Sequence, residues 1–149
     1  MQEVSLNLNL KGLEDFCERL SLNLKVGDIV CLFGELGSGK TTFSRCLINS
    51  IYKNQNKRPP KLIQSPSFPI LLTYELDNFE IYHYDFYRIV NNSELDELNI
   101  FEEIKNSITL IEWPEIILNK LKNYNFYFLN FSITNENIRN IKHNLILDK

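Results

Sequence analysis

Cysteine is scarce in this sequence, and its few cysteines are not arranged in pairs. The three cysteines, Cys17, Cys31 and Cys46, are an odd number and form no CxxC spacing. Neither a disulfide framework nor a zinc site is therefore indicated. Each cysteine lies in an apolar pattern, and we expect all of them to be small buried hydrophobic residues.

Long apolar runs and an excess of basic charge are also missing. No stretch stays apolar for the roughly 20 residues that a membrane-spanning helix needs, and residues 1–12 lack the basic and apolar blocks of a secretory signal. The net charge is −3, from 16 basic and 19 acidic residues, which is unlike a protein that binds nucleic acid alone. We expect a cytoplasmic protein without membrane contact. If RNA is involved in its function, we expect another molecule to provide most of the RNA binding.

The length of the chain leaves little room for a second domain. Its 149 residues are 44% hydrophobic and 23% charged, which is typical of one globular domain with its own core. No internal repeat and no shift in composition marks a boundary. We predict a single domain over residues 1–149, without a separate substrate domain.

Apolar periodicity alternates between that of strands and that of helices along the chain. This alternation predicts a three-layer α/β sandwich. Its central sheet would be mainly parallel, with antiparallel additions and with helices on both faces. Ligands would bind at the carboxyl ends of its strands. The expected strands are residues 4–10, 29–33, 62–75, 79–85, 108–111, 124–134 and 143–147. The expected helices are residues 12–21, a helix from near residue 39 to near residue 52, one starting at the capping-box pair Ser93 and Asp96, and residues 115–121 after Pro114.

Glycine is also scarce, and the few glycines are concentrated near one motif. All five precede residue 40, and three of them lie in residues 31–43, CLFGELGSGKTTF. Gly34, Gly39, Lys40 and Thr41 fit GxxxxGK[ST], the Walker A or P-loop pattern, between an apolar strand and a helix. The motif predicts a phosphate site, so the chain is expected to bind ATP and Mg²⁺.

The chemistry of a P-loop assigns a role to each of its residues. Backbone N–H groups and the helix N-terminus hold the phosphates. Lys40 would reach the β and γ phosphates, the Thr41 hydroxyl would bind Mg²⁺, and Thr42 would contact the α phosphate. The predicted ATP-binding residues of the loop are Leu36, Gly37, Ser38, Gly39, Lys40, Thr41 and Thr42.

Two acidic residues compete for the role of the carboxylate that Mg²⁺ needs. Asp85 ends the strand IYHYD, and Glu112 ends the strand ITLIE. If both strands lie beside the P-loop strand, the two acids share one site, and one could hold the metal while the other positions the attacking water. Lys40, Asp85 and Glu112 are thus the catalytic candidates. His83 lies on the same strand face as Asp85, and we expect an ordinary hydrogen-bonded histidine.

Missing motifs narrow the class of nucleotide-binding protein. No [NT]KxD or DxxG motif of a GTPase and no LSGGQ-like motif of a transporter ATPase occurs, and the arginines at 19, 45, 58, 88 and 139 form no lid cluster. A small ATPase coupled to another protein is favoured. A small kinase for a nucleoside or metabolite, and a binding module gated by its nucleotide, remain the alternatives.

Ordered blocks across residues 27–118 resemble the bacterial TsaE (YjeE) family. They are GDIVCLFGELGSGKTTFSRCL, QSPSFPILLTYE, IYHYDFYRI, SELDELNIFEEI and ITLIEWPE. The resemblance implies a P-loop ATPase that works with the proteins TsaD and TsaB. Those partners form threonylcarbamoyladenosine at position 37 of tRNA, and hydrolysis of ATP by the family resets their assembly; tRNA is thus an indirect partner.

The resemblance also implies roles for individual residues. Asp85 matches an aspartate implicated in hydrolysis, Glu112 an acid at the metal, and Trp113 a tryptophan near the nucleotide. Ser67 matches a threonine in a switch-like loop. Independently of the resemblance, we consider residues 9–13 a candidate border of the base. The chain departs from the family where Pro69 replaces a common threonine, which removes a donor and stiffens the loop, and where Asn99 and Cys46 replace common glycines.

Overall fold

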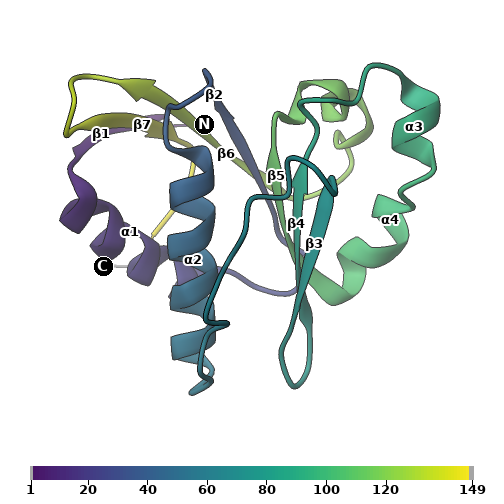
Figure 1. The fold of residues 1–149 in the computed structure, drawn as a ribbon, viewed down its shortest axis with the longest axis horizontal. Helices are drawn as coiled ribbons and strands as arrows, with labels where there is room; N and C mark the ends of the chain where they lie inside the picture. Colours follow the sequence, from purple (N-terminus) through teal and green to yellow (C-terminus); the bar gives the residue numbers. More distant parts are fainter. Residues whose placement is uncertain (1, 148–149) are drawn as a thin grey trace.

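A seven-stranded mixed sheet forms the centre of the computed structural model, which describes residues 2–147 (Figure 1). The order of the strands across the sheet is β1-β7-β6-β2-β5-β4-β3. The strands are β1 Val4–Leu8, β2 Ile29–Gly34, β3 Leu71–Glu75, β4 Glu80–Asp85, β5 Ser107–Glu112, β6 Phe126–Ile133 and β7 Arg139–His143.

Helices cover both faces of this sheet. On one face α1 (Leu10–Asn23) and α2 (Lys40–Asn54) pack side by side, and on the other lie α3 (Asn92–Asp96) and α4 (Ile100–Glu103) (Figure 1). Three 3₁₀ turns, η1 Ile104–Asn106, η2 Pro114–Ile116 and η3 Leu118–Lys120, complete the described helical segments. Each face has its own buried apolar cluster. The predicted three-layer α/β sandwich is confirmed.

The parallel strands lie in the middle of the sheet, and the antiparallel pairs lie at its edges. Strands β6, β2, β5 and β4 run parallel, while β1, β7 and β3 are antiparallel to their neighbours. The central strands are almost continuously apolar because helices cover them on both sides. Their carboxyl ends bring Gly34, Asp85 and Glu112 to one edge of the sheet.

The last strand and the strand before β4 differ from the prediction. We expected a strand at residues 143–147, but β7 ends at His143, because the hairpin closes where Thr134 and Asn135 donate to the Ile138 carbonyl. The segment expected to be extended from residue 62 becomes a strand only at Leu71. A turn precedes it, since Ile70 has a φ of 69° and donates to the Pro66 carbonyl at 2.7 Å.

The predicted helices near residues 93 and 115 are shorter than expected. The cap of α3 is Asn91, whose Oδ1 accepts from the Glu94 N–H at 3.0 Å, so the Ser93–Asp96 capping box was wrong. The helix stops because Asn99 is left-handed, with φ 50°, a conformation that asparagine tolerates better than most residues. The segment after Pro114 forms two 3₁₀ turns in place of the predicted helix. None of the helices within residues 2–147 combines the length and the apolarity needed to cross a bilayer.

Candidate nucleotide and metal site

The loop from Gly34 to Lys40 joins β2 to α2 at the carboxyl edge of the sheet. Gly34 has a φ of 142°, and a Cβ there would lie 2.6 Å from the Ser38 Oγ and 2.7 Å from the Phe131 carbonyl oxygen. Gly39 caps α2 with a φ of 107°. Only glycine meets both demands, so the pattern of glycines follows from the path of the backbone. The N-terminus of α2 is thereby exposed to the site.

Lys40 is folded into the concave side of its own loop. Its side chain belongs to a residue that is only 5% exposed, and Nζ donates to the carbonyl oxygens of Gly34 at 2.6 Å and Glu35 at 2.9 Å. The ammonium also lies 4.2 Å from the centre of the Trp113 ring, a cation–π distance. Burial lowers the pKa of Lys40, against the opposing effect of the Glu112 carboxylate. The cation is therefore held at the mouth of the loop, where a phosphate would contact it.

Glu112 is the most fully hydrogen-bonded acid of the site. It is 1% exposed, and Oε2 accepts from the Thr41 hydroxyl at 3.1 Å. Its other oxygen, Oε1, lies 3.2 Å from Ser44 Oγ and 3.1 Å from His83 Nε2. A P-loop hydroxyl and a strand-ending carboxylate are thus in direct contact, as the two protein ligands of one Mg²⁺ ion would be.

Asp85 lies beside Glu112 at the end of the next strand. It is 5% exposed, and Oδ1 accepts from the Tyr87 N–H at 2.9 Å. Burial raises the pKa of Asp85, and the Glu112 charge adds to the rise, against the hydrogen bond from Tyr87. Within residues 2–147 no group of three or more His, Cys, Asp and Glu side chains could hold a metal. A metal here would rely on Thr41, the two acids and phosphate oxygens.

Trp113 and Ser67 border the site from two different loops. Trp113 has a left-handed φ of 55°, and its ring contacts Tyr87 with centroids 4.8 Å apart. Such a conformation is strained for a tryptophan and is often found at functional sites. Ser67 is exposed, and its N–H lies 3.4 Å from the Ser65 hydroxyl.

One cavity of about 320 Å³ brings all the predicted site residues together. It is lined by Leu36, Gly37, Ser38, Gly39, Lys40, Thr41, Thr42, Ser67, Asp85, Glu112 and Trp113, together with Ser65 and Arg139, which were not predicted. Ser44, which holds Glu112, was missed too. Its position four residues after Lys40 places it on the same helix face and could have revealed it. No local signal marks Arg139, which the β6–β7 hairpin carries to the site.

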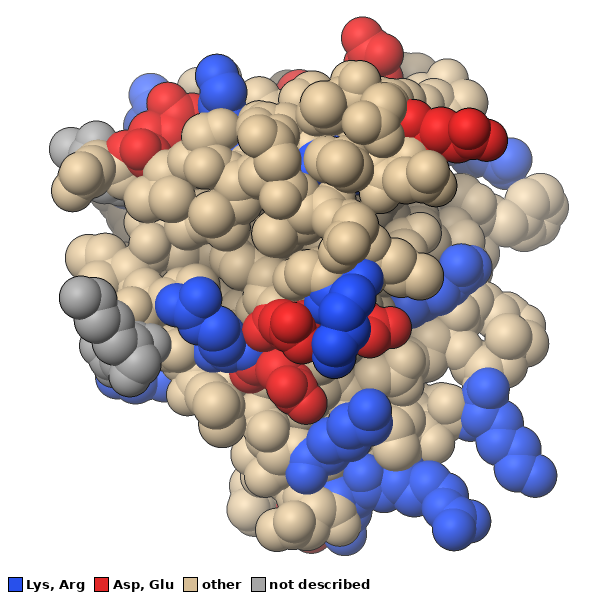
Figure 2. Space-filling model, turned by 90° about the vertical axis from the view of Figure 1, so that its left-hand side faces the viewer, with Lys and Arg blue, Asp and Glu red and all other residues tan. Residues whose placement is uncertain are grey.

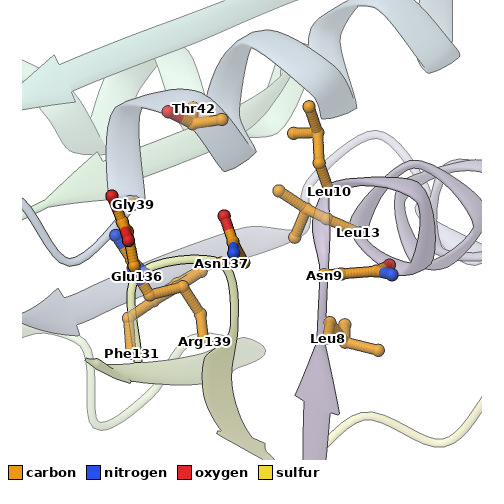
Figure 3. A pocket seen from close by; sticks show the side chains of 10 residues that line it. All are labelled: Leu8, Asn9, Leu10, Leu13, Gly39, Thr42, Phe131, Glu136, Asn137 and Arg139. Carbon is orange, nitrogen blue, oxygen red and sulfur yellow. The ribbon is translucent and has the colours of Figure 1, made fainter. Parts of the chain in front are cut away.

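A second cavity of about 230 Å³ adjoins the first, since Gly39, Thr42 and Arg139 line both. Figure 3 shows it between the start of α2, the β1–α1 connection and the β6–β7 hairpin. The walls are formed by Leu8, Asn9, Leu10, Leu13, Gly39, Thr42, Phe131, Glu136, Asn137 and Arg139. Leucine and phenylalanine side chains make much of this lining apolar, with a few polar groups at its edge. Such a cavity suits a flat heterocycle.

The surface on the α1 side of the molecule carries charges of both signs. Basic and acidic side chains lie next to one another across the middle of this face (Figure 2). Lys11 and Asp15 of α1 form an exposed pair at 3.0 Å. Below this mixed band, the side chains of Lys and Arg predominate on the same face (Figure 2).

Comparisons with known proteins agree on one family. A family model described as threonylcarbamoyl adenosine biosynthesis protein TsaE matches residues 8–142. The tRNA threonylcarbamoyladenosine biosynthesis protein TsaE of Rickettsia typhi is 44% identical over 108 residues, which cover 72% of this chain and 71% of that protein. The protein of the same name from Borreliella burgdorferi is 30% identical over 125 residues, covering 83% and 86%.

A solved structure shares the fold. The crystal structure of "Bacillus subtilus YdiB" superposes with a TM-score of 0.69 and covers 95% of this chain and 84% of that one. The two sequences are 20% identical, so this likeness concerns the fold alone.

Proposed function

The chain belongs to the TsaE family of threonylcarbamoyl adenosine biosynthesis proteins, and we propose that it is the Mg²⁺-dependent ATPase subunit of the tRNA-modifying machinery. One observation carries this proposal: the 3.1 Å contact between Thr41 Oγ1 and Glu112 Oε2, beside the buried Lys40 of the P-loop. A hydroxyl and a carboxylate that already meet are a prepared site for a hard cation.

Each site residue has a distinct task in this proposal. Lys40 and the N-terminus of α2 bind the phosphates, and Thr41 and Glu112 hold Mg²⁺. Mg²⁺ would neutralise charge on the β and γ phosphates. Asp85, held through one oxygen by the Tyr87 N–H, orients the attacking water and accepts its hydrogen bond. Trp113 closes the side of the site next to Lys40, and the Ser67 hydroxyl responds to the γ phosphate.

The adenine base is assigned to the cavity of Figure 3. That cavity opens beside Gly39 and Thr42, so a nucleotide whose phosphates lie on the P-loop can extend into it. Arg139 spans both cavities. Its Nη1 donates to the Asn135 carbonyl at 2.9 Å, while its buried Nε has no hydrogen-bond partner among the described residues. We assign Arg139 to the ribose and base side of the nucleotide.

We propose that partner proteins, and not this chain, carry out the modification of tRNA. The described residues form one sheet with its helices, without a separate domain for a phosphoryl acceptor, which supports water as the acceptor of the γ phosphate and a separate protein as the user of the hydrolysis. The family resemblance names the partners as TsaD and TsaB, acting on tRNA in the cytoplasm. Hydrolysis in this chain resets their assembly between turnovers.

Binding of Mg·ADP to Lys40→Ala is the first test. The only tryptophan, Trp113, lies 4.2 Å from Lys40 Nζ, so its fluorescence reports occupation of the site. Lys40→Ala should lose at least about 100-fold in affinity, since charge-assisted contacts to phosphate contribute about 3 kcal/mol. Lys53→Ala, at the other end of α2, is the matched control. Equal affinity of the two variants would exclude the P-loop as the binding site.

The fate of the γ phosphate separates the proposal from its rivals. With γ-labelled ATP, the label should appear as inorganic phosphate. Transfer to a metabolite would identify a kinase. Undiminished modification with a non-hydrolysable ATP analogue would identify a nucleotide-gated binding module.

A further inference from the structure

His83 and Glu112 form a buried pair that the proposed reaction does not yet use. His83 of β4 is 0% exposed, and Nε2 lies 3.1 Å from Glu112 Oε1. In the parallel register His83 is opposite Leu110, two residues before Glu112. Side chains two residues apart on a strand share a face. His83 and Glu112 are thus diagonal neighbours on the face that α2 covers.

Glu112 Oε1 has two neighbouring donors, His83 and Ser44, and only His83 donates to no other acceptor. We assign the hydrogen of this pair to Nε2 of His83, because an ionised carboxylate can only accept. The other neighbour, Ser44 Oγ, lies 3.2 Å from Oε1 but 3.0 Å from the Lys40 carbonyl oxygen. A serine hydroxyl has a single hydrogen, which it must share between these two acceptors. Without His83, Oε1 would keep only this shared contact.

The position of His83 is poorly suited to a purely structural histidine. Its neighbours across the sheet are Leu72 and Leu110, and its Nδ1 is buried without a hydrogen-bond partner in the part of the chain that the structure describes. An unpaired buried polar atom costs stability. An aliphatic side chain would avoid that cost, so the benefit of the histidine must lie in the hydrogen bond to Glu112.

We propose that His83 is a positioning residue for the metal site, holding Glu112 Oε1 so that Oε2 faces Thr41 and the cation. Outer partners of this kind fix the orientation of a ligand, and their loss lowers metal affinity by about 10–100-fold. The proposal rests on the proposed function, because it assigns the cation to Glu112 and Thr41.

Three substitutions at His83 separate positioning from packing. His83→Gln keeps an N–H donor at the reach of Nε2, His83→Asn is shorter by one methylene and cannot reach Oε1, and His83→Leu removes the donor. His143→Leu is the control, because it replaces the other buried histidine, which packs against Phe16. Thermal unfolding of each variant establishes that it is folded.

Trp113 fluorescence then measures ADP affinity in EDTA and across a titration with Mg²⁺. All variants should bind metal-free ADP within about threefold of the wild type. The Mg²⁺ concentration for half-maximal effect should rise about 10–100-fold in His83→Asn and His83→Leu, and should return to within about threefold in His83→Gln. If His83→Leu does not fold, the Asn and Gln variants carry the comparison.

An unchanged Mg²⁺ dependence in His83→Asn would overturn the positioning role while leaving the nucleotide site intact. If the ADP affinity of the wild-type protein did not depend on Mg²⁺, the proposed function would be wrong, and the positioning role of His83 with it. A second readout needs no metal: with two histidines in the chain, ¹⁵N NMR can assign the tautomer of His83. The proposal requires the hydrogen on Nε2, and a hydrogen on Nδ1 alone would contradict it.

Discussion

Asp85 and Glu112 lie directly opposite each other at the carboxyl ends of two neighbouring parallel strands. Only Glu112 is hydrogen-bonded to Thr41, whereas Asp85 accepts from the Tyr87 backbone. Two like charges at one edge of a sheet repel, which a bound cation would relieve. Their different partners support different tasks, with the metal on Glu112 and the water on Asp85.

Asp85→Asn should separate hydrolysis from binding. The amide oxygen can still accept from the Tyr87 N–H, but it cannot act as a base for water. We expect ATP turnover to fall about 100-fold or more, with Mg·ADP affinity within about threefold of the wild type. Phosphate release and Trp113 fluorescence measure the two quantities. Asp77→Asn, which replaces an exposed acid paired with Lys57, should leave both unchanged. Undiminished hydrolysis by Asp85→Asn would refute the assignment of that acid.

The same substitution should stabilise the nucleotide-free protein at neutral pH. Burial raises the pKa of Asp85 above its ordinary value of 3.8, so the folded state holds this proton more tightly than the unfolded chain. Protonated Asp85 therefore contributes to the free energy of unfolding at pH values below the pKa that Asp85 has in the unfolded chain. This contribution is lost as the pH rises through the pKa that Asp85 has in the folded protein. The asparagine of Asp85→Asn does not ionise, so the variant does not lose this contribution. The difference in unfolding free energy between the variant and the wild type should therefore grow as the pH rises between the two pKa values, and should stay constant above them.

Thermal unfolding of both proteins between about pH 4 and pH 7 measures this effect. A gain of about 1 kcal/mol corresponds to a rise in Tm of roughly 2–4 °C for a chain of this size. A gap between the two Tm values that narrows as pH rises would contradict the raised pKa of Asp85.

Gly34→Ala should destabilise the fold more than Gly27→Ala. Both glycines have positive φ, but a Cβ at Gly34 meets the Phe131 carbonyl oxygen at 2.7 Å, whereas at Gly27 it meets nothing within 4 Å. The backbone strain alone costs about 1–2 kcal/mol at either site, and the clash adds about 1–3 kcal/mol at Gly34. Urea unfolding compares the two variants. Equal losses of unfolding free energy would show that the loop moves to admit the methyl group.

Arg139→Ala should weaken ADP binding more than pyrophosphate binding. The residue borders the proposed base cavity, so its loss affects the nucleoside more than the phosphates. We expect about a tenfold loss for ADP, which corresponds to about 1.4 kcal/mol, and about twofold or less for pyrophosphate. Arg45→Ala, on the exposed side of α2 near Ile63, is the control. Equal losses for both ligands would place Arg139 at the phosphates.

The phosphate loop could be predicted from the sequence because its geometry is almost entirely local. The glycines, Lys40 and the start of α2 are consecutive, and the backbone conformation of the loop selects them. The two acids were also found, since each ends an apolar strand. The sequence could not show which acid would bind the metal and which would position the water. That distinction depends on contacts with Thr41 and Tyr87, which form only in the folded chain.

Other features were ambiguous in the sequence for physical reasons. Residues 143–147, HNLIL, are more apolar than residues 139–143, RNIKH, but the tight hairpin at residues 134–138 decided that the second segment pairs as β7. The segment after Pro114 is too short for helical periodicity to distinguish an α-helix from 3₁₀ turns. Arg139, at the start of β7, and Ser65, in the segment before β3, reach the cavity from parts of the chain far from the P-loop, and no spacing along the chain marks such an approach.

Hydrolysis of ATP measured beside tRNA modification tests the central claim most directly. Phosphate release should be slow for the chain alone and should rise on the order of tenfold or more with TsaD, TsaB and tRNA, which corresponds to an activation barrier lower by about 1.4 kcal/mol or more. Modified tRNA should accumulate over repeated turnovers only while ATP is hydrolysed. Equal rates of hydrolysis with and without the partners, while modification proceeds, would contradict the account.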